Sequence, residues 1–256
     1  MQEIVQGPAT DGGGSDLDVP AIVWLAWSLA VGIPLMLGGI RLSRLTTGAA
    51  IGTALALCIW ASFVNALSAG GISDVLLMIL CMGAFVCGFV IGVFNFARAI
   101  GIAALAALGG LSVGVRIILL RPGLLIPDPF WPNWLIIAVL GAVTLLLAIF
   151  RQRASIVICS AAVGTFLTFL GIDLIINKQA GMSMGLRHLF DTNSAHIQYF
   201  VEHHYSPPIL TEILLGVSLV LIPILAYGQH RFFKQPFKRV RSWTLDSRTL
   251  GEDVDP

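Results

Sequence analysis

The chain is dominated by long apolar runs that short polar segments interrupt. Seven runs are long enough to cross a hydrocarbon core of ~30 Å as helices, which takes about 20 residues each. Backbone groups in lipid need hydrogen-bond partners within their own segment, and the runs lack the alternation of β-barrel strands. The pattern predicts an all-α, polytopic membrane bundle with spans at about 21–40, 45–67, 72–94, 97–120, 131–150, 154–177 and 209–227.

Lysine and arginine residues alternate between the two sides of the predicted membrane. Eleven of the 15 fall in the turns after spans one, three and five and in the C-terminal tail. Cytosolic segments carry the excess of such residues, so the N-terminus is expected outside and the C-terminus in the cytosol. The expected organisation is an exterior acidic tail at 1–20, a seven-span domain at 21–229 with an exterior loop at 178–208, and a cytosolic tail at 230–256.

Short cytosolic turns and small residues suggest how the spans pack. The turns predict three helical hairpins (spans one with two, three with four, five with six) plus a seventh helix. Small residues four positions apart let helix backbones approach closely in lipid. Such pairs predict a tight bundle built on spans two, three, four and six: Gly48/Gly52, Gly88/Gly92, Gly110/Gly114 and Ser160/Gly164.

Composition agrees with a membrane protein and limits what the exterior loop can be. The chain is 57% hydrophobic and 11% charged, whereas soluble domains are about 25% charged. The loop at 178–208 mixes methionine, leucine and aromatic residues with histidines and acids. This mixture predicts a helix lying on the membrane surface.

Few ionisable residues fall inside the spans, and each is a candidate for function because intramembrane charge is costly. They are Asp74, Arg116, Asp173 and Glu212. Counting helical rise places all four near the exterior interface, as one polar layer. We expect Arg116 to pair with Asp173, with Glu212 as the competing partner. The layer either braces helices, with side chains extended toward the headgroups, or forms a binding or conducting site.

Catalytic and metal-binding patterns are weak. The histidines of the exterior loop, His188, His196, His203 and His204, match no established ligand spacing. The G-x-S-x-G match centred on Ser112 falls in the middle of a span, whereas a nucleophile elbow needs a strand-to-helix turn. We therefore expect no enzymatic activity, no cofactor, no metal site and no nucleic-acid partner.

The C-terminal tail begins with a basic and aromatic segment. Its cations are Arg231, Lys234, Lys238, Arg239 and Arg241. Each cation near an anionic surface contributes ~1 kcal/mol to binding. The segment is either a contact for anionic lipid or the ordinary basic flank of a last span.

Three glycine-rich stretches, at 38–48, 88–94 and 161–173, carry a family resemblance. With the order of spans, they resemble the seven-transmembrane superfamily member 3/transmembrane protein 198-like domain family over about residues 21–227. The resemblance implies seven spans and no known enzymatic activity. It also implies a plasma membrane or endomembrane vesicle location, where transmembrane protein 198 is linked to Wnt receptor signalling. The family has no settled catalytic residues to transfer.

Two functions fit these observations. The first is a non-enzymatic scaffold or signalling-associated component of the membrane, with the lipid bilayer and unidentified membrane proteins as partners. The alternative is a transporter or channel for an ion or small solute that uses the polar layer. The inner halves of the spans are almost free of ionisable groups, which argues against conduction.

Overall fold

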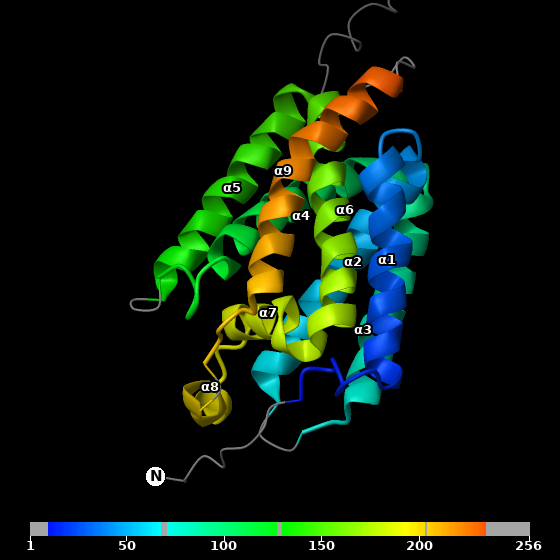
Figure 1. Cartoon of the computed structure of the whole chain (residues 1–256). Helices are drawn as coiled ribbons and strands as arrows, with labels where there is room; N and C mark the ends of the chain where they lie inside the picture. The colour runs from blue at the N-terminus through cyan, green and yellow to red at the C-terminus, as the bar shows by residue number, and fades with distance from the viewer. Residues whose placement is uncertain (1–9, 68–70, 127–129, 203, 234–256) are drawn as a thin grey trace, which may run out of the picture.

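The computed structural model describes residues 10–67, 71–126, 130–202 and 204–233, and these form a bundle of long helices (Figure 1). Seven helices are long and apolar enough to cross a membrane, which confirms the predicted fold class. They begin and end within two residues of the predicted spans, except that the last continues to Phe232. They are α1 (Val19–Gly38), α2 (Ser43–Ala66), α3 (Asp74–Val93), α4 (Arg98–Leu119), α5 (Trp131–Phe150), α6 (Gln152–Asn177) and α9 (Ile209–Phe232).

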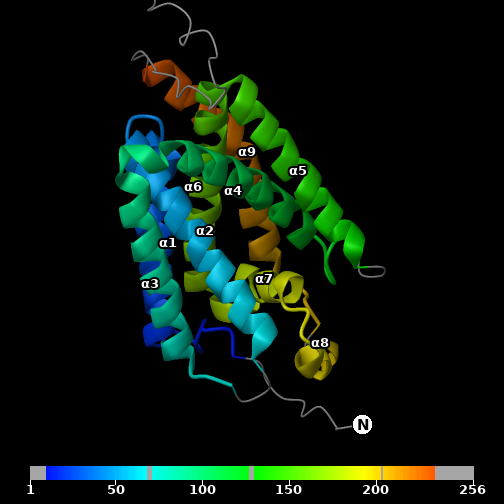
Figure 2. The same cartoon turned by 180° about the vertical axis from the view of Figure 1, so that it is seen from behind.

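Two short helices lie between α6 and α9 in the chain. They are α7 (Met182–Phe190) and α8 (Ile197–Glu202), and three 3-10 turns complete the described structure: η1 (Asn95–Ala97), η2 (Lys178–Ala180) and η3 (Ser194–His196). Both short helices lie at the same end of the bundle as the N-terminal segment (Figures 1 and 2). We call this the capped end.

The opposite end of the bundle is the basic end. It holds the turn between α1 and α2, the start of α4 and the turn between α5 and α6, with Arg41, Arg44, Arg98, Arg151 and Arg153. The described chain starts at the capped end and α9 finishes at the basic end (Figure 1). The assignment of the basic end to the cytosol stays a prediction from the positive-inside pattern.

The helices that pack most extensively are not the consecutive pairs predicted from the turns. The main contacts join α2 with α3, α1 with α6, α4 with α5, and α6 with α9. Helices joined by basic-end turns contact each other much less, and α1 makes few contacts with α2. The short basic-end turns therefore join helices whose most extensive packing is with other helices.

Glycines set the distance between α2 and α3, as the small-residue spacing predicted. A Cβ atom added at Gly88 would lie 2.8 Å from the Cα of Gly52, and one at Gly92 would lie 2.7 Å from the Cα of Gly48. Two backbones this close leave no room for any side chain at these positions. Alanine at either site would force the helices apart and weaken the packing that holds them together in lipid.

Burial identifies α6 as the centre of the bundle and α5 as a peripheral helix. In the most apolar 18-residue stretch of α6, 78% of residues are buried, against 17% for α5. The exposed face of α5 carries apolar side chains such as Leu135, Val139 and Leu146. A 20-residue helix rises about 30 Å, the thickness of the hydrocarbon core, so this face suits direct contact with lipid.

Candidate functional site

The four residues of the predicted polar layer have different partners in the structure. Asp74 begins α3 and accepts a hydrogen bond from the backbone N–H of Gly12 at 3.1 Å. Glu212 lies in the first turn of α9 and is partly exposed. Arg116 and Asp173 are both fully buried. Within the described part of the chain, no ion pair joins any two of the four residues.

Asp173 ties three helices together through neutral donors. Its Oδ1 accepts hydrogen bonds from Asn177 Nδ2 at 2.8 Å and from Thr211 Oγ1 at 2.7 Å. Its Oδ2 accepts the backbone N–H of Met182 at 2.5 Å. Met182 begins α7, so this N–H has no partner within its own helix, and a carboxylate suits the positive end of the helix dipole. Asp173 therefore braces α6 against α7 and α9.

The turn after α6 brings α7 to this carboxylate. The helix α6 ends at Asn177; the next residue, Lys178, has a positive φ of 52°, and η2 begins there and reverses the chain. Gly181 precedes α7, and a Cβ atom there would overlap the carboxylate of Asp173. Glycine at this position is thus a steric condition for the contact between Asp173 and α7.

Arg116 is buried between α4 and α6 and is only partly satisfied. Its Nη2 donates to the carbonyl oxygen of Ala162 at 2.6 Å and to Thr165 Oγ1 at 2.9 Å. The guanidinium carbon lies 5.2 Å from the centre of the Phe166 ring, within cation–π range. Its Nε and Nη1 are buried and have no hydrogen-bond partner in the part of the chain that the structure describes. The side chain is thus held by one carbonyl, one hydroxyl and one ring.

The predicted pair between Arg116 and Asp173 does not form, although α4 and α6 are neighbours as expected. Side chains on a helix lean toward its N-terminus, which for α4 lies at the basic end. The long side chain of Arg116 therefore reaches toward the middle of the bundle, at Thr165. Thr165 precedes Asp173 by eight residues (173 minus 165), about 12 Å of helical rise. The prediction placed the α-carbons at a common depth and neglected the direction of the side chain.

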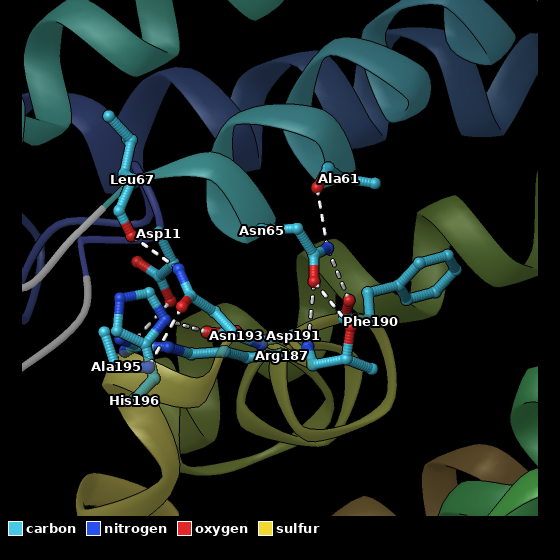
Figure 3. Close-up of polar contacts among 11 residues, drawn as sticks. Asp11, Ala61, Asn65, Leu67, Arg187, Phe190, Asp191, Asn193, Ala195 and His196 are labelled. Atoms are coloured by element: carbon cyan, nitrogen blue, oxygen red, sulfur yellow. Dashed lines mark hydrogen bonds and ion pairs between the residues drawn. The ribbon is translucent and has the colours of Figure 1, made fainter. Parts of the chain in front are cut away.

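A polar network ties the end of α2 to the segment after α7 (Figure 3). Asn65 Nδ2 donates to the carbonyl oxygen of Phe190 at 2.8 Å, and Asn65 Oδ1 accepts from Thr192 N at 2.9 Å. Asn193 Nδ2 donates to the carbonyl oxygen of Leu67 at 2.6 Å. These side chains thus form hydrogen bonds with backbone groups that have no secondary-structure partner in the loop.

The same region contains charged residues that are largely shielded from solvent (Figure 3). His196 Nδ1 lies 2.7 Å from Asp191 Oδ2, and both side chains are buried. Arg187 Nη1 lies 3.5 Å from Asp11 Oδ2, and the Arg187 guanidinium lies over the Tyr199 ring at 4.6 Å. These contacts attach the N-terminal segment to α7 and α8.

The N-terminal segment at residues 10–18 lies across the capped end. Two indole N–H groups hold it: Trp24 Nε1 donates to the carbonyl oxygen of Gly12, and Trp60 Nε1 donates to that of Asp11, both at 2.9 Å. Lys178 forms an ion pair with Asp16 at the exposed edge. The segment thereby connects α1, α2 and the turn after α6.

The exterior loop was predicted as a helix on the membrane surface, and for α7 this prediction was wrong. Met182 and Leu189 are fully buried, and Gly185 lies against Leu119 and Tyr205. The apolar face of α7 is thus covered by α4 and its neighbours instead of lipid. Tyr205 donates its hydroxyl to the carbonyl oxygen of Leu119 at 3.0 Å. Burial raises the pKa of Tyr205, and nearby carboxylates raise it further.

A cavity of about 150 Å³ lies in the half of the bundle next to the capped end. Residues of α1, α2, α4 and α6 form its walls, and the N-terminal segment and α7 line it at the capped end. Most of the lining is apolar, with three tryptophans, Trp24, Trp27 and Trp60. Arg116, Asp173 and Glu212 do not line it. Its deepest lining residues, such as Thr53 and Val163, lie near the middle of their helices.

At the basic end, the structure describes one of the five residues predicted to contact anionic lipid. Arg231 is exposed in the last turn of α9, whereas Lys234, Lys238, Arg239 and Arg241 lie outside the described residues. Arg153 Nη2 donates to the carbonyl oxygen of Phe233 at 2.8 Å and so fixes the end of α9 against α6. The lipid contact stays a prediction.

Sequence reasoning missed the cavity and the N-terminal segment that covers it. A signal was present in the sequence. Trp24 and Trp27 lie near the start of span one and Trp60 near the end of span two, which is the same side of the membrane, and buried indole N–H groups need acceptors. Asn65 and Arg187 carried no such signal, because their partners are backbone atoms or distant residues that only the fold brings near. Of the predicted loop histidines, His196 bonds to Asp191 and His188 packs 4.6 Å from the Phe200 ring; His203 lies outside the described residues.

Comparisons with known proteins place this architecture in a family. Neither the comparison with curated proteins nor that with solved structures gives a match. A family model described as the TM7S3/TM198-like domain matches residues 25–230, from the first turns of α1 to the last turn of α9. The match covers all seven spans and the cap between α6 and α9. The chain therefore belongs to the TM7S3/TM198-like domain family.

Proposed function

We propose that this multi-pass membrane protein acts as a non-enzymatic scaffold or signalling-associated component that engages a membrane-protein partner at its capped end. The observation that carries the proposal is the built surface at that end. Segments far apart in the chain are joined there by hydrogen bonds from Asn65 and Asn193 and by the pair of Asp11 with Arg187. A preorganised surface loses less conformational entropy on binding than a mobile loop does.

Exposed apolar side chains on α8 support a protein contact at this surface. Ile197 and Val201 are 57% and 60% exposed on one face of a six-residue helix. Their neighbours Tyr199 and Phe200 pack against Arg187 and His188, which fixes the orientation of that face. We expect the partner to bury Ile197 and Val201, because apolar area removed from water is the main favourable term in association.

We also propose that the protein has no enzymatic role. The hydrogen bonds already made by the candidate reactive side chains support this proposal. Ser112, the centre of the G-x-S-x-G match, donates its hydroxyl to the carbonyl oxygen of Gly109 within α4. Asp173 is occupied by three donors. A nucleophile needs a base within hydrogen-bond reach, and among the described residues Ser112 bonds only to this backbone acceptor.

A transporter or channel is the second candidate, because the cavity enters the capped half of the bundle. Against it, the lining ends near the middle of the spans. In the basic half, Gly39 packs against Ser160, and Gly101 packs against Thr47. Flux measurements in reconstituted vesicles distinguish the two functions. Transport requires a flux above that of empty vesicles. An absence of such flux in the parent chain, with no change in flux in the Asp173→Asn variant, excludes transport.

Proximity labelling in intact cells tests the scaffold proposal. A labelling enzyme fused to the C-terminus reports the compartment, which we propose is the plasma membrane or endomembrane vesicles, and the neighbouring proteins. We expect Ile197→Ser with Val201→Ser to remove a specific set of neighbours. The matched control, Asn95→Ala, changes an exposed residue at the basic end and leaves that set intact. An identical set of neighbours for all variants would contradict the proposed docking surface.

A further inference from the structure

The cavity at the capped half has the properties of a ligand site that the proposed function does not require. Four spans surround it, and its volume of about 150 Å³ holds a body the size of a benzene ring. Trp24, Trp60 and Phe190 give it broad aromatic walls, and Leu108 and Leu167 close it on the side of α4 and α6. Aromatic and aliphatic walls of this kind favour an apolar guest.

Two residues that line the cavity each carry a buried polar atom with no hydrogen-bond partner among the described residues. Three tryptophans line the cavity; Trp24 and Trp60 donate to the N-terminal segment, whereas the Nε1 of Trp27 is buried without an acceptor. The hydroxyl of Thr53, a residue only 8% exposed, also lacks a partner. Buried donors without acceptors are costly, so both groups favour a guest that carries an oxygen atom.

The charge of the lining indicates the charge of the guest. Asp11 is the one ionisable residue among the described lining residues, and it already faces Arg187 Nη1 at 3.5 Å. Among those same residues, no cation is present to receive an anionic guest. An anionic guest would lose its hydration without gaining a counter-charge, and a cationic guest would have to compete with Arg187 for Asp11, so both are disfavoured. An uncharged guest has no such penalty.

We propose that this cavity binds a small uncharged molecule with an apolar ring or short chain and one hydroxyl or carbonyl oxygen. The apolar part lies among the aromatic walls, and the oxygen forms a hydrogen bond with Trp27 Nε1 or with the hydroxyl of Thr53. The inference goes beyond the proposed function, because binding here requires no partner protein at α8.

Tryptophan fluorescence provides the test on the full chain in lipid nanodiscs. Trp131, Trp134 and Trp243 are changed to phenylalanine, so that emission comes from the three cavity tryptophans. The probes are 4-bromobenzyl alcohol and bromobenzene, whose bromine quenches indole emission, with concentrations expressed per lipid volume. We expect saturable quenching by both probes and roughly fivefold tighter binding of the alcohol, the effect of one hydrogen bond.

Variants separate binding in the cavity from solution in the bilayer. Ala56→Leu enlarges a buried lining residue and should abolish saturation, whereas the matched control Cys58→Leu adds a similar side chain at an exposed position of α2 that does not line the cavity. Thr53→Val keeps the shape and should reduce the preference for the alcohol. The alcohol should also raise the melting temperature of the parent chain.

Three results would overturn the inference. Linear quenching of equal slope in the parent and in Ala56→Leu means that the probe dissolves in lipid only. No quenching and no thermal shift means that the cavity is closed to such guests or holds only water. If the two probes bind with equal affinity and Thr53→Val changes neither affinity, the guest's oxygen atom makes no contribution to binding. Because Thr53→Val preserves side-chain volume, it tests the inference even if Ala56→Leu does not fold.

Discussion

Arg116 and Asp173 are both fully buried on neighbouring helices, yet their charges are satisfied in different ways. Asp173 lies near the capped end, where the last residue of α6, the first residue of α7 and the first turn of α9 each supply one donor. Arg116 reaches the middle of the bundle, and within the described residues it uses only Nη2 for hydrogen bonds, to Ala162 and Thr165. Depth in the membrane thus decides how much polar backbone is available to a buried charge.

The comparison shows that two opposite charges on adjacent helices do not have to pair. Backbone groups in the middle of a span are already bonded within their helix, so a cation there finds few acceptors. A guanidinium at mid-bilayer costs ~2.5–3.5 kcal/mol on the insertion scale. The carbonyl, the hydroxyl and the Phe166 ring offset part of this cost for Arg116. Asp173 instead lies where the chain leaves its regular helix.

Removal of Asp173 should have the largest effect on stability. Asp173→Ala leaves the N–H of Met182 and the hydroxyl of Thr211 without their acceptor and removes one of the two acceptors of Asn177 Nδ2, and we expect a loss of about 3 kcal/mol. Unfolding by SDS titration in mixed micelles measures it. Glu212→Ala, at a partly exposed position with no ion pair among the described residues, is the control and should cost less than about 1 kcal/mol. Equal losses would mean that Asp173 does not brace the three helices.

Removal of one acceptor from Arg116 should have a smaller effect. Thr165→Val deletes the hydroxyl that receives Nη2 and leaves the carbonyl oxygen of Ala162, so we expect a loss of about 1.5 kcal/mol in the same titration. Thr168→Val is a matched control one turn later on α6, because the buried hydroxyl of Thr168 has no partner. It should be neutral or slightly stabilising, and a larger loss for Thr168 than for Thr165 would contradict the described contacts.

Replacement of the arginine itself should change stability less than Asp173→Ala or Thr165→Val does. Arg116→Leu removes a half-satisfied charge and fills the space with apolar atoms, and such replacements are often neutral or stabilising. We expect a change within about 1 kcal/mol. A loss above about 2 kcal/mol would show that Arg116 has a strong partner besides those described. If stability is unchanged but the proximity-labelling pattern changes, Arg116 serves function instead of folding.

The double variant gives the most direct test of the comparison. Arg116→Leu combined with Asp173→Ala should cost the sum of the two single changes to within about 0.5 kcal/mol, because residues without shared partners act independently. An ion pair would instead make the double variant more stable than Asp173→Ala alone. A coupling energy above about 1 kcal/mol would restore the pair predicted from the sequence.

The sequence was sufficient to predict the seven helices but not their arrangement. Length and apolar content define a span without reference to any neighbour, as for Trp131–Phe150, which matches the predicted span at both ends. Glycine spacing indicated that spans two and three pack tightly within the bundle, and the structure shows that their glycines face each other. The packing of α1 on α6 was missed, because a helix that is apolar on every side does not show which face meets a partner.

The candidate site was harder to predict for a different reason. Arg116 and Asp173 were identified as buried charges, but their partners depend on side-chain direction and on a turn whose path the sequence does not reveal. Thr53 and Trp27 were not singled out, because threonine and tryptophan are common in membrane spans. What distinguishes them is the lack of a partner, and this is visible only once every neighbour is in place.

The packing of α1 on α6 also constrains biosynthesis. Residue 38, the end of α1, is synthesised 114 residues before residue 152, the start of α6 (152 minus 38). At about 5–20 residues per second, the ribosome needs roughly 6–23 s to cover that distance. During this interval Gly32 of α1 and Gly39, which follows the helix, are not yet packed against α6. We expect a chaperone or the insertion machinery at the translocon to cover these glycines until α6 is made. Nascent chains halted before α6 should then be preferred substrates for quality control.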